Sequence, residues 1–348
     1  MRILVVNTQA PFVQGGAEFH ADNLVSALRS TGHEADLVKI PFTWSDPKRV
    51  LDQMLAVRLL DLTESYHRPI DLVIGMKFPA YLVRHPNKVL WILHQHKMAY
   101  EHWKEPSPAD PNPTLRSQVR ESIVRADNQF IPEARRIFAN SATVANRLRQ
   151  NNHIDAEALY HPPPGHERIY PGEFGNYVFY PSRLGEAKRQ HLAVEAFSRV
   201  KDDFRLVIAG FSEGEGYESR LRESIERHGL QDRVQMLGAI SEEQKLDLYA
   251  NARGVLYLPR DEDYGYVTLE AFLAGKPVIT CSDSGGPLEF VRDGENGRVC
   301  PPEPVHIAAA IEELAKDREQ ARRLGSRGRD YLHSLDLSWH GVVEALVS

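Results

Sequence analysis

Short apolar runs alternate with amphipathic helical patterns along the whole chain, and this alternation constrains the fold more than any other feature. The predicted strands are residues 3–7, 35–40, 71–75, 89–93 and 137–139 in the first half, and 177–180, 205–209, 234–237, 254–258 and 277–280 in the second half. Their near-continuous apolar character is typical of strands that are covered on both faces. The sequence therefore predicts an α/β fold with two doubly wound parallel sheets.

A proline-rich segment divides the chain into two predicted domains. A chain of 348 residues is longer than one hydrophobic core usually supports. Pro162, Pro163 and Pro164 stiffen the backbone directly before Gly165, which permits a turn. We therefore predict domains at residues 1–164 and 165–336, followed by a short amphipathic helix at about 337–348. Other helices are predicted at residues 17–31, 47–65, 192–200 and 267–274.

The composition excludes several classes of partner. A net charge of -6 does not indicate the broad basic surface that a nucleic-acid-binding protein needs. The two cysteines, Cys281 and Cys300, have no neighbours at metal-ligand spacing, which favours a reducing, cytoplasmic compartment. Residues 47–65 mix cations with carboxylates around the helix, whereas membrane-surface helices gather cations on one face. We therefore expect at most peripheral association with a membrane.

Residues 261–277 carry the clearest pattern of a binding site. Glu262 and Glu270 flank Gly265, which follows a predicted strand and opens a predicted helix. The free N–H groups at the start of a helix favour an anion, and two carboxylates accept hydrogen bonds from hydroxyl groups. The pattern therefore indicates a ligand with several hydroxyl groups and a phosphate. The alternative is a surface loop with two solvated acids.

A basic turn follows the predicted strand at residues 177–180. Arg183 and Lys188 lie on this turn, where two fixed cations attract a phosphate group. A basic turn by itself is more often a solvated surface. Its occurrence together with Glu262 and Glu270 favours a site.

Four segments together resemble retaining glycosyltransferases of family 4, which have the GT-B fold. Residues 262–270 resemble the E-x7-E motif, with Asp263 in the place of the usual glycine, and residues 182–188 resemble G-R-L-x-x-x-K. Residues 15–18 resemble G-G-A-E, and residues 282–289 resemble S-D-x-G-G-x-x-E. The resemblance implies two Rossmann-like domains that face each other across a cleft. The first would bind the acceptor and the second the nucleotide sugar, with the last helix packed back on the first.

The resemblance also implies a role for each matching residue. Arg183 and Lys188 would hold the diphosphate, Glu270 the ribose, and Glu262 the donor sugar. The remaining donor contacts would be Gly265, Tyr266, Val267, Gly15, Gly16 and Gly238, with Gly238 near the nucleobase. A histidine after the strand at residues 89–93 would contact the sugar or the acceptor, and this position fits His94 first and His96 second. Tyr100 and Trp103 are predicted to contact the acceptor or to pack as parts of a surface loop.

The activity implied is retaining transfer of a sugar from a nucleoside-diphosphate sugar, UDP or GDP in the first place, to a hydroxyl acceptor. The family needs no metal and no other cofactor. By analogy the product would be a bacterial polysaccharide, glycolipid or other glycoconjugate.

The alternatives to a glycosyltransferase are a GT-B nucleotide-sugar epimerase or phosphorylase, and a non-catalytic nucleotide-sugar-binding module. A dinucleotide fingerprint is excluded because the glycines near residue 15 lack the G-x-G-x-x-G spacing. The residues do not define an oligomeric state.

Overall fold

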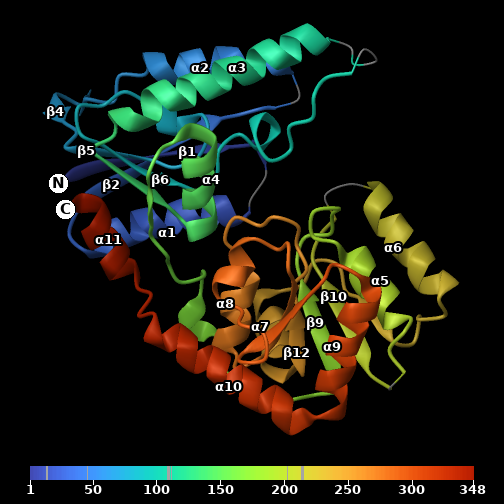
Figure 1. The fold of residues 1–348 in the computed structure, drawn as a ribbon. Coiled ribbons are helices and arrows are strands. Elements are labelled where there is room, and N and C mark those ends of the chain that lie inside the picture. The colour runs from blue at the N-terminus through green and yellow to red at the C-terminus, as the bar shows by residue number, and fades with distance from the viewer. Residues whose placement is uncertain (13–14, 45, 108–109, 111, 202, 213–214) are drawn as a thin grey trace. The chain divides into compact units, whose positions relative to one another are not determined.

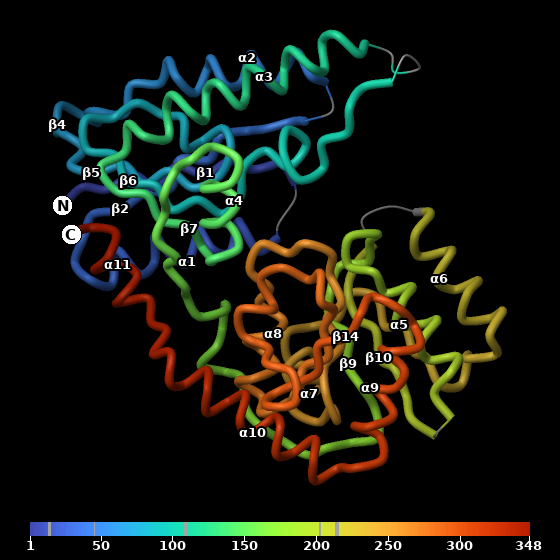
Figure 2. The backbone as a smooth tube through the Cα atoms, in the orientation of Figure 1, coloured from blue at the N-terminus to red at the C-terminus, as the bar shows by residue number. Residues whose placement is uncertain are grey.

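The computed structural model describes residues 1–348 except 13–14, 45, 108–109, 111, 202 and 213–214 (Figure 1). The chain forms two compact units, the first with Met1–Pro164 and Ser338–Ser348, the second with Gly165–Leu337. The chain thus leaves the first unit within the proline-rich segment and returns to it for its last residues (Figure 2).

The first unit is built on a six-stranded parallel sheet with the order β2-β1-β5-β6-β7-β8. Its strands are β1 (Arg2–Gln9), β2 (Glu34–Pro41), β5 (Leu72–Gly75), β6 (Lys88–Ile92), β7 (Arg136–Ala139) and β8 (Glu157–Ala158). Val5 and Val6 are fully buried neighbours that join different hydrophobic clusters. Successive side chains of a strand point to opposite faces, so both faces of this sheet are covered.

Helices on the two faces of the first sheet supply these clusters. The helices are α1 (Gly16–Ser30), α2 (Pro47–Leu59), α3 (Pro113–Phe130), α4 (Ala142–Asn152) and α11 (Trp339–Val347). The cluster with Val6 takes buried residues from α2, α3 and α4, and the cluster with Val5 takes them from α1 and α11. Figure 1 shows α2 and α3 running side by side on one side of the sheet.

The helix predicted at residues 47–65 is too long, because α2 ends at Leu59. Asp61 accepts hydrogen bonds from the backbone N–H and the hydroxyl of Thr63, at 3.0 and 2.6 Å, and so forms a turn. Glu64–Ser65 (β3) then pairs with Arg68–Pro69 (β4) as a two-stranded antiparallel ladder. The start was predicted at the right residue, since the Asp46 carboxylate accepts the Lys48 N–H and Pro47 needs no partner.

The second unit has its own six-stranded parallel sheet, with the order β11-β10-β9-β12-β13-β14. Its strands are β9 (Tyr177–Pro181), β10 (Arg205–Ala209), β11 (Val234–Met236), β12 (Gly254–Leu256), β13 (Val278–Cys281) and β14 (Gly297–Cys300). Its helices are α5 (Gln190–Phe197), α6 (Glu215–Arg227), α7 (Glu242–Asn251), α8 (Tyr266–Leu273), α9 (Pro304–Lys316) and α10 (Arg318–Ser334). The order reverses between β9 and β12, and such reversals place ligands at the carboxyl ends of the strands.

The prediction of an α/β fold with two doubly wound parallel sheets is confirmed. Strands β8 and β14 were not predicted, because β8 has two residues and β14 contains Gly297 and Arg298 at the sheet edge. Short 3₁₀ turns are η1 (Ala80–Leu82), η2 (Lys97–Ala99), η3 (Ile131–Glu133), η4 (His166–Arg168) and η5 (Gly286–Glu289). Within the described part of the chain, no helix is both long enough and apolar enough to cross a membrane.

Candidate functional site

The point where the strand order of the second sheet reverses brings together side chains that are far apart in the sequence. Strands β9 and β12 are hydrogen-bonded neighbours, with Val178 opposite Gly254. Lys188 lies on the loop after β9, and Glu262 lies on the loop after β12. The structure therefore joins the basic turn and the first carboxylate at one edge of one sheet.

Glu262 is held by a cation and a phenol. Its carboxylate contacts the Lys188 ammonium and accepts a hydrogen bond of 2.8 Å from the Tyr257 hydroxyl. Lys188 Nζ also lies 3.3 Å from the same hydroxyl oxygen. The Lys188 and Glu262 side chains are each 18% exposed, so the pair faces solvent while remaining largely shielded. Partial shielding strengthens the attraction between the two charges and orients both groups.

The backbone around Glu262 is fixed by the segment that follows β13. The Glu262 N–H donates to the Ser284 carbonyl at 2.9 Å, and its carbonyl accepts from the Gly286 N–H at 2.8 Å. A Cβ on Gly285, whose φ is +73°, would lie 2.5 Å from the Glu262 carbonyl oxygen. Only glycine fits this close approach, which explains Gly285 in structural terms.

Glu270, the second carboxylate of the motif, lies in α8 and is largely buried. It accepts a hydrogen bond of 2.6 Å from the Tyr249 hydroxyl and lies 3.2 Å from Lys245 Nζ. Burial acts to lower the pKa of Lys245, yet the carboxylates of Glu270 and Glu242 raise this pKa above its usual value. Lys245 therefore stays charged. Both Lys245 and Tyr249 come from α7, and sequence analysis missed them because no motif links α7 to α8.

Arg189 was also missed, although it directly follows Lys188. Its two terminal nitrogens lie 2.8 and 2.7 Å from the two oxygens of Asp283, and it donates to the carbonyls of Leu258 and Pro259. The hydrogen bonds from Arg189 lower the pKa of Asp283. This bidentate pair ties the loop after β9 to the segments after β12 and β13. Arg189 therefore fixes the loops that carry the site residues.

The other predicted donor contacts of the second unit lie on nearby loops and on α8. Arg183 is exposed, and its carbonyl accepts from the Gln190 amide at 2.9 Å. Gly265 precedes α8 with φ +91°, and Tyr266 and Val267 form the first turn of this helix. Gly238 has φ +67°, and a Cβ there would meet no atom within 4 Å, so space beside its backbone is open.

In the first unit, the predicted glycines lie at the start of α1. Gly15 is the N-cap residue and Gly16 the first helical residue. Glu18 in the first turn pairs with Lys77 at 3.0 Å, and the two side chains are 10% and 15% exposed. The ion pair fixes this turn against the segment that follows β5.

His94 follows β6, as predicted, and is half-buried. Its Nδ1 lies 2.7 Å from the Gln95 carbonyl oxygen. His96 packs on Phe78 at a ring-centroid distance of 5.0 Å and on Phe42 at 5.9 Å. Burial lowers the pKa of His96 to about 4, so its imidazole is neutral near pH 7.

Tyr100, predicted to contact the acceptor or to pack as part of a loop, has its hydroxyl directed into the first unit. Its hydroxyl donates to the buried Asp127 at 2.7 Å and accepts from the Asn152 amide at 3.1 Å. Asp127 also accepts from Tyr81 at 2.9 Å and from Gln95 at 3.0 Å. A buried carboxylate needs such donors, and this need turns the Tyr100 hydroxyl inward.

Trp103 is half-exposed, and its ring nitrogen donates to Glu105 at 3.0 Å. The stretch predicted from Pro106 to Pro113 lies partly outside the described residues.

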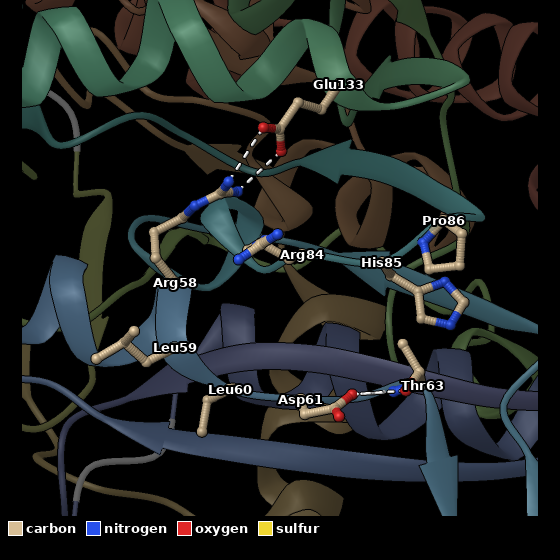
Figure 3. Close-up of a pocket in the computed structure, with 9 residues that line it drawn as sticks. All are labelled: Arg58, Leu59, Leu60, Asp61, Thr63, Arg84, His85, Pro86 and Glu133. Atoms are coloured by element: carbon tan, nitrogen blue, oxygen red, sulfur yellow. Dashed lines mark hydrogen bonds and ion pairs between the residues drawn. The ribbon is translucent and has the colours of Figure 1, made fainter.

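One pocket of the first unit lies away from all of these residues (Figure 3). It has a volume of about 540 Å³, and its lining includes Arg84, His85 and Glu133. These residues precede β6 and β7, so the pocket lies at the amino ends of the strands. Figure 3 shows the Arg58 guanidinium directed at both carboxylate oxygens of Glu133, at 2.8 and 3.1 Å. The Glu133 carboxylate therefore offsets the charge of Arg58 in this pocket.

The residues of the second unit form one electrostatic site. Lys188 offers a positive charge beside Glu262, while Glu270 offers carboxylate oxygens beside a charged lysine. Such a site can hold hydroxyl groups and a diphosphate side by side. No group of three or more His, Cys, Asp or Glu side chains that could hold a metal ion occurs among the described residues.

The second unit matches the model of a known protein family. Residues 170–331 match the family model described as "Glycosyl transferases group 1", and this span contains Lys188, Glu262 and Glu270. The second unit is therefore similar to group 1 glycosyltransferases over nearly its whole length. The predicted resemblance is therefore confirmed at the level of the group.

Curated relatives extend the likeness beyond the glycosyltransferase domain. The "Alpha-1,3/1,6-mannosyltransferase ALG2" of Dictyostelium discoideum is 32% identical over 55% of this chain and 50% of its own length. The human protein of the same name is 28% identical over 62% of this chain and 59% of its own length. The chain thus spans between half and two thirds of these two relatives. They are eukaryotic, whereas other relatives, such as a "D-inositol 3-phosphate glycosyltransferase" of Nocardia farcinica, are bacterial.

Solved structures share the architecture over nearly the whole chain. A sucrose-phosphate synthase from Thermosynechococcus elongatus has a TM-score of 0.80 at 17% identity, covering 99% of this chain and 97% of its own. HepE from Anabaena, solved with UDP and glucose, has a TM-score of 0.73 at 20% identity and covers 100% of both chains. The chain therefore has the GT-B fold.

Proposed function

We propose that this protein is a retaining glycosyltransferase that moves a sugar from a nucleoside-diphosphate sugar to a hydroxyl group of an acceptor. The observation that carries the proposal is the contact between Lys188 and Glu262 where the strand order of the second sheet reverses, with Glu270 on the adjoining helix. This arrangement provides a cation for phosphate and two carboxylates for hydroxyl groups. The match of the second unit to group 1 glycosyltransferases supports it.

In the proposed reaction each group has a distinct task. Glu270 accepts hydrogen bonds from the ribose hydroxyls, and Glu262 binds a hydroxyl of the donor sugar. Lys188 and Arg183 bind the diphosphate, whose negative charge grows as its bond to the sugar breaks. The acceptor oxygen bonds to the same sugar carbon from the same face, and its proton passes to the departing phosphate oxygen. The two cations supply the positive charge, so we propose that no metal ion is required.

We propose UDP and GDP as the first nucleotides to test. The proposal draws on a structural neighbour solved with UDP-glucose and on relatives named as mannosyltransferases. The acceptor pathway would be polysaccharide, glycolipid or glycoconjugate synthesis. The same proposal places the protein in the cytoplasm or at the inner face of a membrane, in keeping with two buried, free cysteines.

Thermal unfolding with nucleotides tests the donor site directly. The purified chain is heated with UDP, GDP, ADP or dTDP and with their common sugar conjugates, with and without Mg²⁺. We expect one nucleotide family to raise the melting temperature without Mg²⁺, and Glu270→Ala to abolish the rise. Glu226→Ala, which removes an exposed carboxylate on α6, is the matched control and should keep it.

Product analysis separates this proposal from an epimerase or a binding module. A transferase releases nucleoside diphosphate only when an acceptor is present. Release without an acceptor, or tight donor binding without turnover on any acceptor, would contradict the proposal. No thermal shift with any nucleotide would contradict the donor site itself.

A further inference from the structure

A groove in the first unit carries a second set of binding groups. Its volume is about 100 Å³, and its lining residues come from the segments after β2 and β6 and from α2 and α3. They include Trp44, His96, Met98, Trp103 and Arg120. Trp44 follows β2 and His96 follows β6, so the groove lies at the carboxyl edge of the first sheet, where such folds bind ligands.

The walls of the groove are apolar and open to solvent. Trp44 is 61% exposed and Met98 is 49% exposed, while Trp103 is half-exposed. His96 adds a neutral ring that stacks on Phe78. Large apolar side chains gathered at the surface mark a binding site, and aromatic faces suit the C–H face of a sugar ring.

Arg120 gives the groove a positive charge, with no carboxylate at ion-pair distance among the described residues. Its Nε donates to the Ala99 carbonyl at 3.0 Å, and its guanidinium carbon lies 5.0 Å from the centroid of the Trp103 ring. Across the part of the chain that the structure describes, Arg120 has no carboxylate partner, whereas its neighbour Arg116 pairs with Asp110 at 2.6 Å. A half-buried guanidinium that lies beside an aromatic ring and donates once to a carbonyl still has donors for an anion.

We propose that this groove binds the acceptor of the reaction, and that the acceptor carries an anionic group which Arg120 binds. The acceptor ring would lie against Trp44 and Trp103, with the anion at the Arg120 end of the groove. A phosphate and a carboxylate are the two groups that match a guanidinium fork. The inference rests on the proposed glycosyl transfer and adds to it the chemical class of the acceptor.

Three probes that differ in one substituent test the inference. The full chain is titrated by calorimetry with phenyl β-glucoside, its 6-phosphate, and phenyl β-glucuronide, in which position 6 is a carboxylate. We expect an anionic probe to bind about tenfold or more tightly than the neutral glucoside, in keeping with a charge-assisted hydrogen bond. The stronger of the two anionic probes distinguishes a phosphate from a carboxylate.

Matched variants identify the residue responsible. Arg120→Gln should remove the preference for the anionic probe, while Arg125→Gln, an exposed arginine on the same helix, should keep it. Trp103→Phe should weaken all three probes by a similar factor. Equal binding of the three probes by the parent, no binding of any, or a preference that survives Arg120→Gln would overturn the inference.

A parallel measurement keeps this test separate from that of the donor site. The nucleotide-dependent rise in melting temperature depends on residues of the second unit and should be the same in Arg120→Gln as in the parent. If that rise is present while the probes fail to discriminate, the acceptor inference is wrong and the proposed function stands. If the rise is absent in the parent, the donor site is wrong whatever the groove binds.

Discussion

At the residue scale, Lys188 is the side chain on which the donor site most depends. It contacts Glu262 and would bind the diphosphate, so Lys188→Gln loses a charge where charge develops in the reaction. A hydrogen bond to a charged group contributes about 1.5–3 kcal/mol, so we expect turnover to fall about tenfold to a hundredfold. Steady-state kinetics measure the change, with the exposed Lys201→Gln as control. Parental turnover in Lys188→Gln would contradict its role.

Asp127 contributes to the stability of the fold and has no role in the proposed reaction. Its contribution to the free energy of unfolding depends on pH. Burial raises the pKa of Asp127 to about 6, against hydrogen bonds from Tyr100, Tyr81 and Gln95 that act to lower it. The folded state therefore binds a proton more tightly than the unfolded state, so this group stabilises the fold as pH falls from about 6 towards 4 and loses that contribution as pH rises. Asp127→Asn lacks this dependence.

The free energy of unfolding of Asp127→Asn is measured in urea at pH 5 and pH 7 beside the parent. We expect a loss of about 2 kcal/mol or more at pH 7, because a single amide oxygen replaces two acceptor oxygens. The loss should be about 1 kcal/mol larger at pH 5. A smaller loss at pH 5 than at pH 7 would show that the carboxyl is not protonated in the folded state.

At the element scale, α11 is held to the first unit by aromatic contacts. The Trp339 ring centroid lies 5.5 Å from His161, 6.0 Å from His20 and 6.1 Å from Trp91. The Arg136 guanidinium also donates to the Ala345 carbonyl at 3.1 Å. We expect Trp339→Ala to lower the free energy of unfolding of the first unit by about 2–3 kcal/mol, since the side chain is only partly buried.

Chemical denaturation followed by tryptophan fluorescence measures this loss, and His340→Ala, an exposed neighbour, is the control. Because the second unit has its own core, the nucleotide-dependent thermal shift should survive in Trp339→Ala. Loss of that shift together with the stability would show that the two units do not fold independently.

At the scale of the whole molecule, buried histidines make the first unit sensitive to acid. Burial lowers the pKa of His20 to about 3 and that of His96 to about 4, and it lowers the pKa of His161 well below its usual value. The unfolded chain takes up these protons below pH 6.5, while the folded chain does not. Stability is therefore retained above about pH 6.5 and lost as pH falls below it.

Between pH 7.5 and pH 5 the three histidines should lower the free energy of unfolding by about 6 kcal/mol. Asp127 offsets about 1 kcal/mol of this, so we expect a net loss of about 5 kcal/mol. Thermal unfolding at the two pH values checks this loss. All three histidines belong to the first unit, so the transition of that unit should move to lower temperature more than the transition of the second unit. Equal transitions at both pH values would contradict the buried, neutral state of these rings.

The sequence by itself determined the α/β class and the order of most elements, because apolar strands covered on both faces and glycine or proline stops are local signals. It also determined the positions of Glu262, Glu270 and Lys188 in the chain, since each belongs to a short motif. The sequence did not predict strands β8 and β14 or the end of α2. The two edge strands are short, and the turn that Asp61 forms leaves only a weak signal in the sequence.

Only the tertiary structure decided which side chains meet. The partners of Glu270 come from α7, the carboxylate that holds Arg189 comes after β13, and the Tyr100 hydroxyl turns inward to Asp127. In each of these contacts the two residues are far apart in the sequence and do not belong to one motif. They arise because parallel strands bring distant loops to one edge and because a buried charge must find its donors wherever the fold provides them.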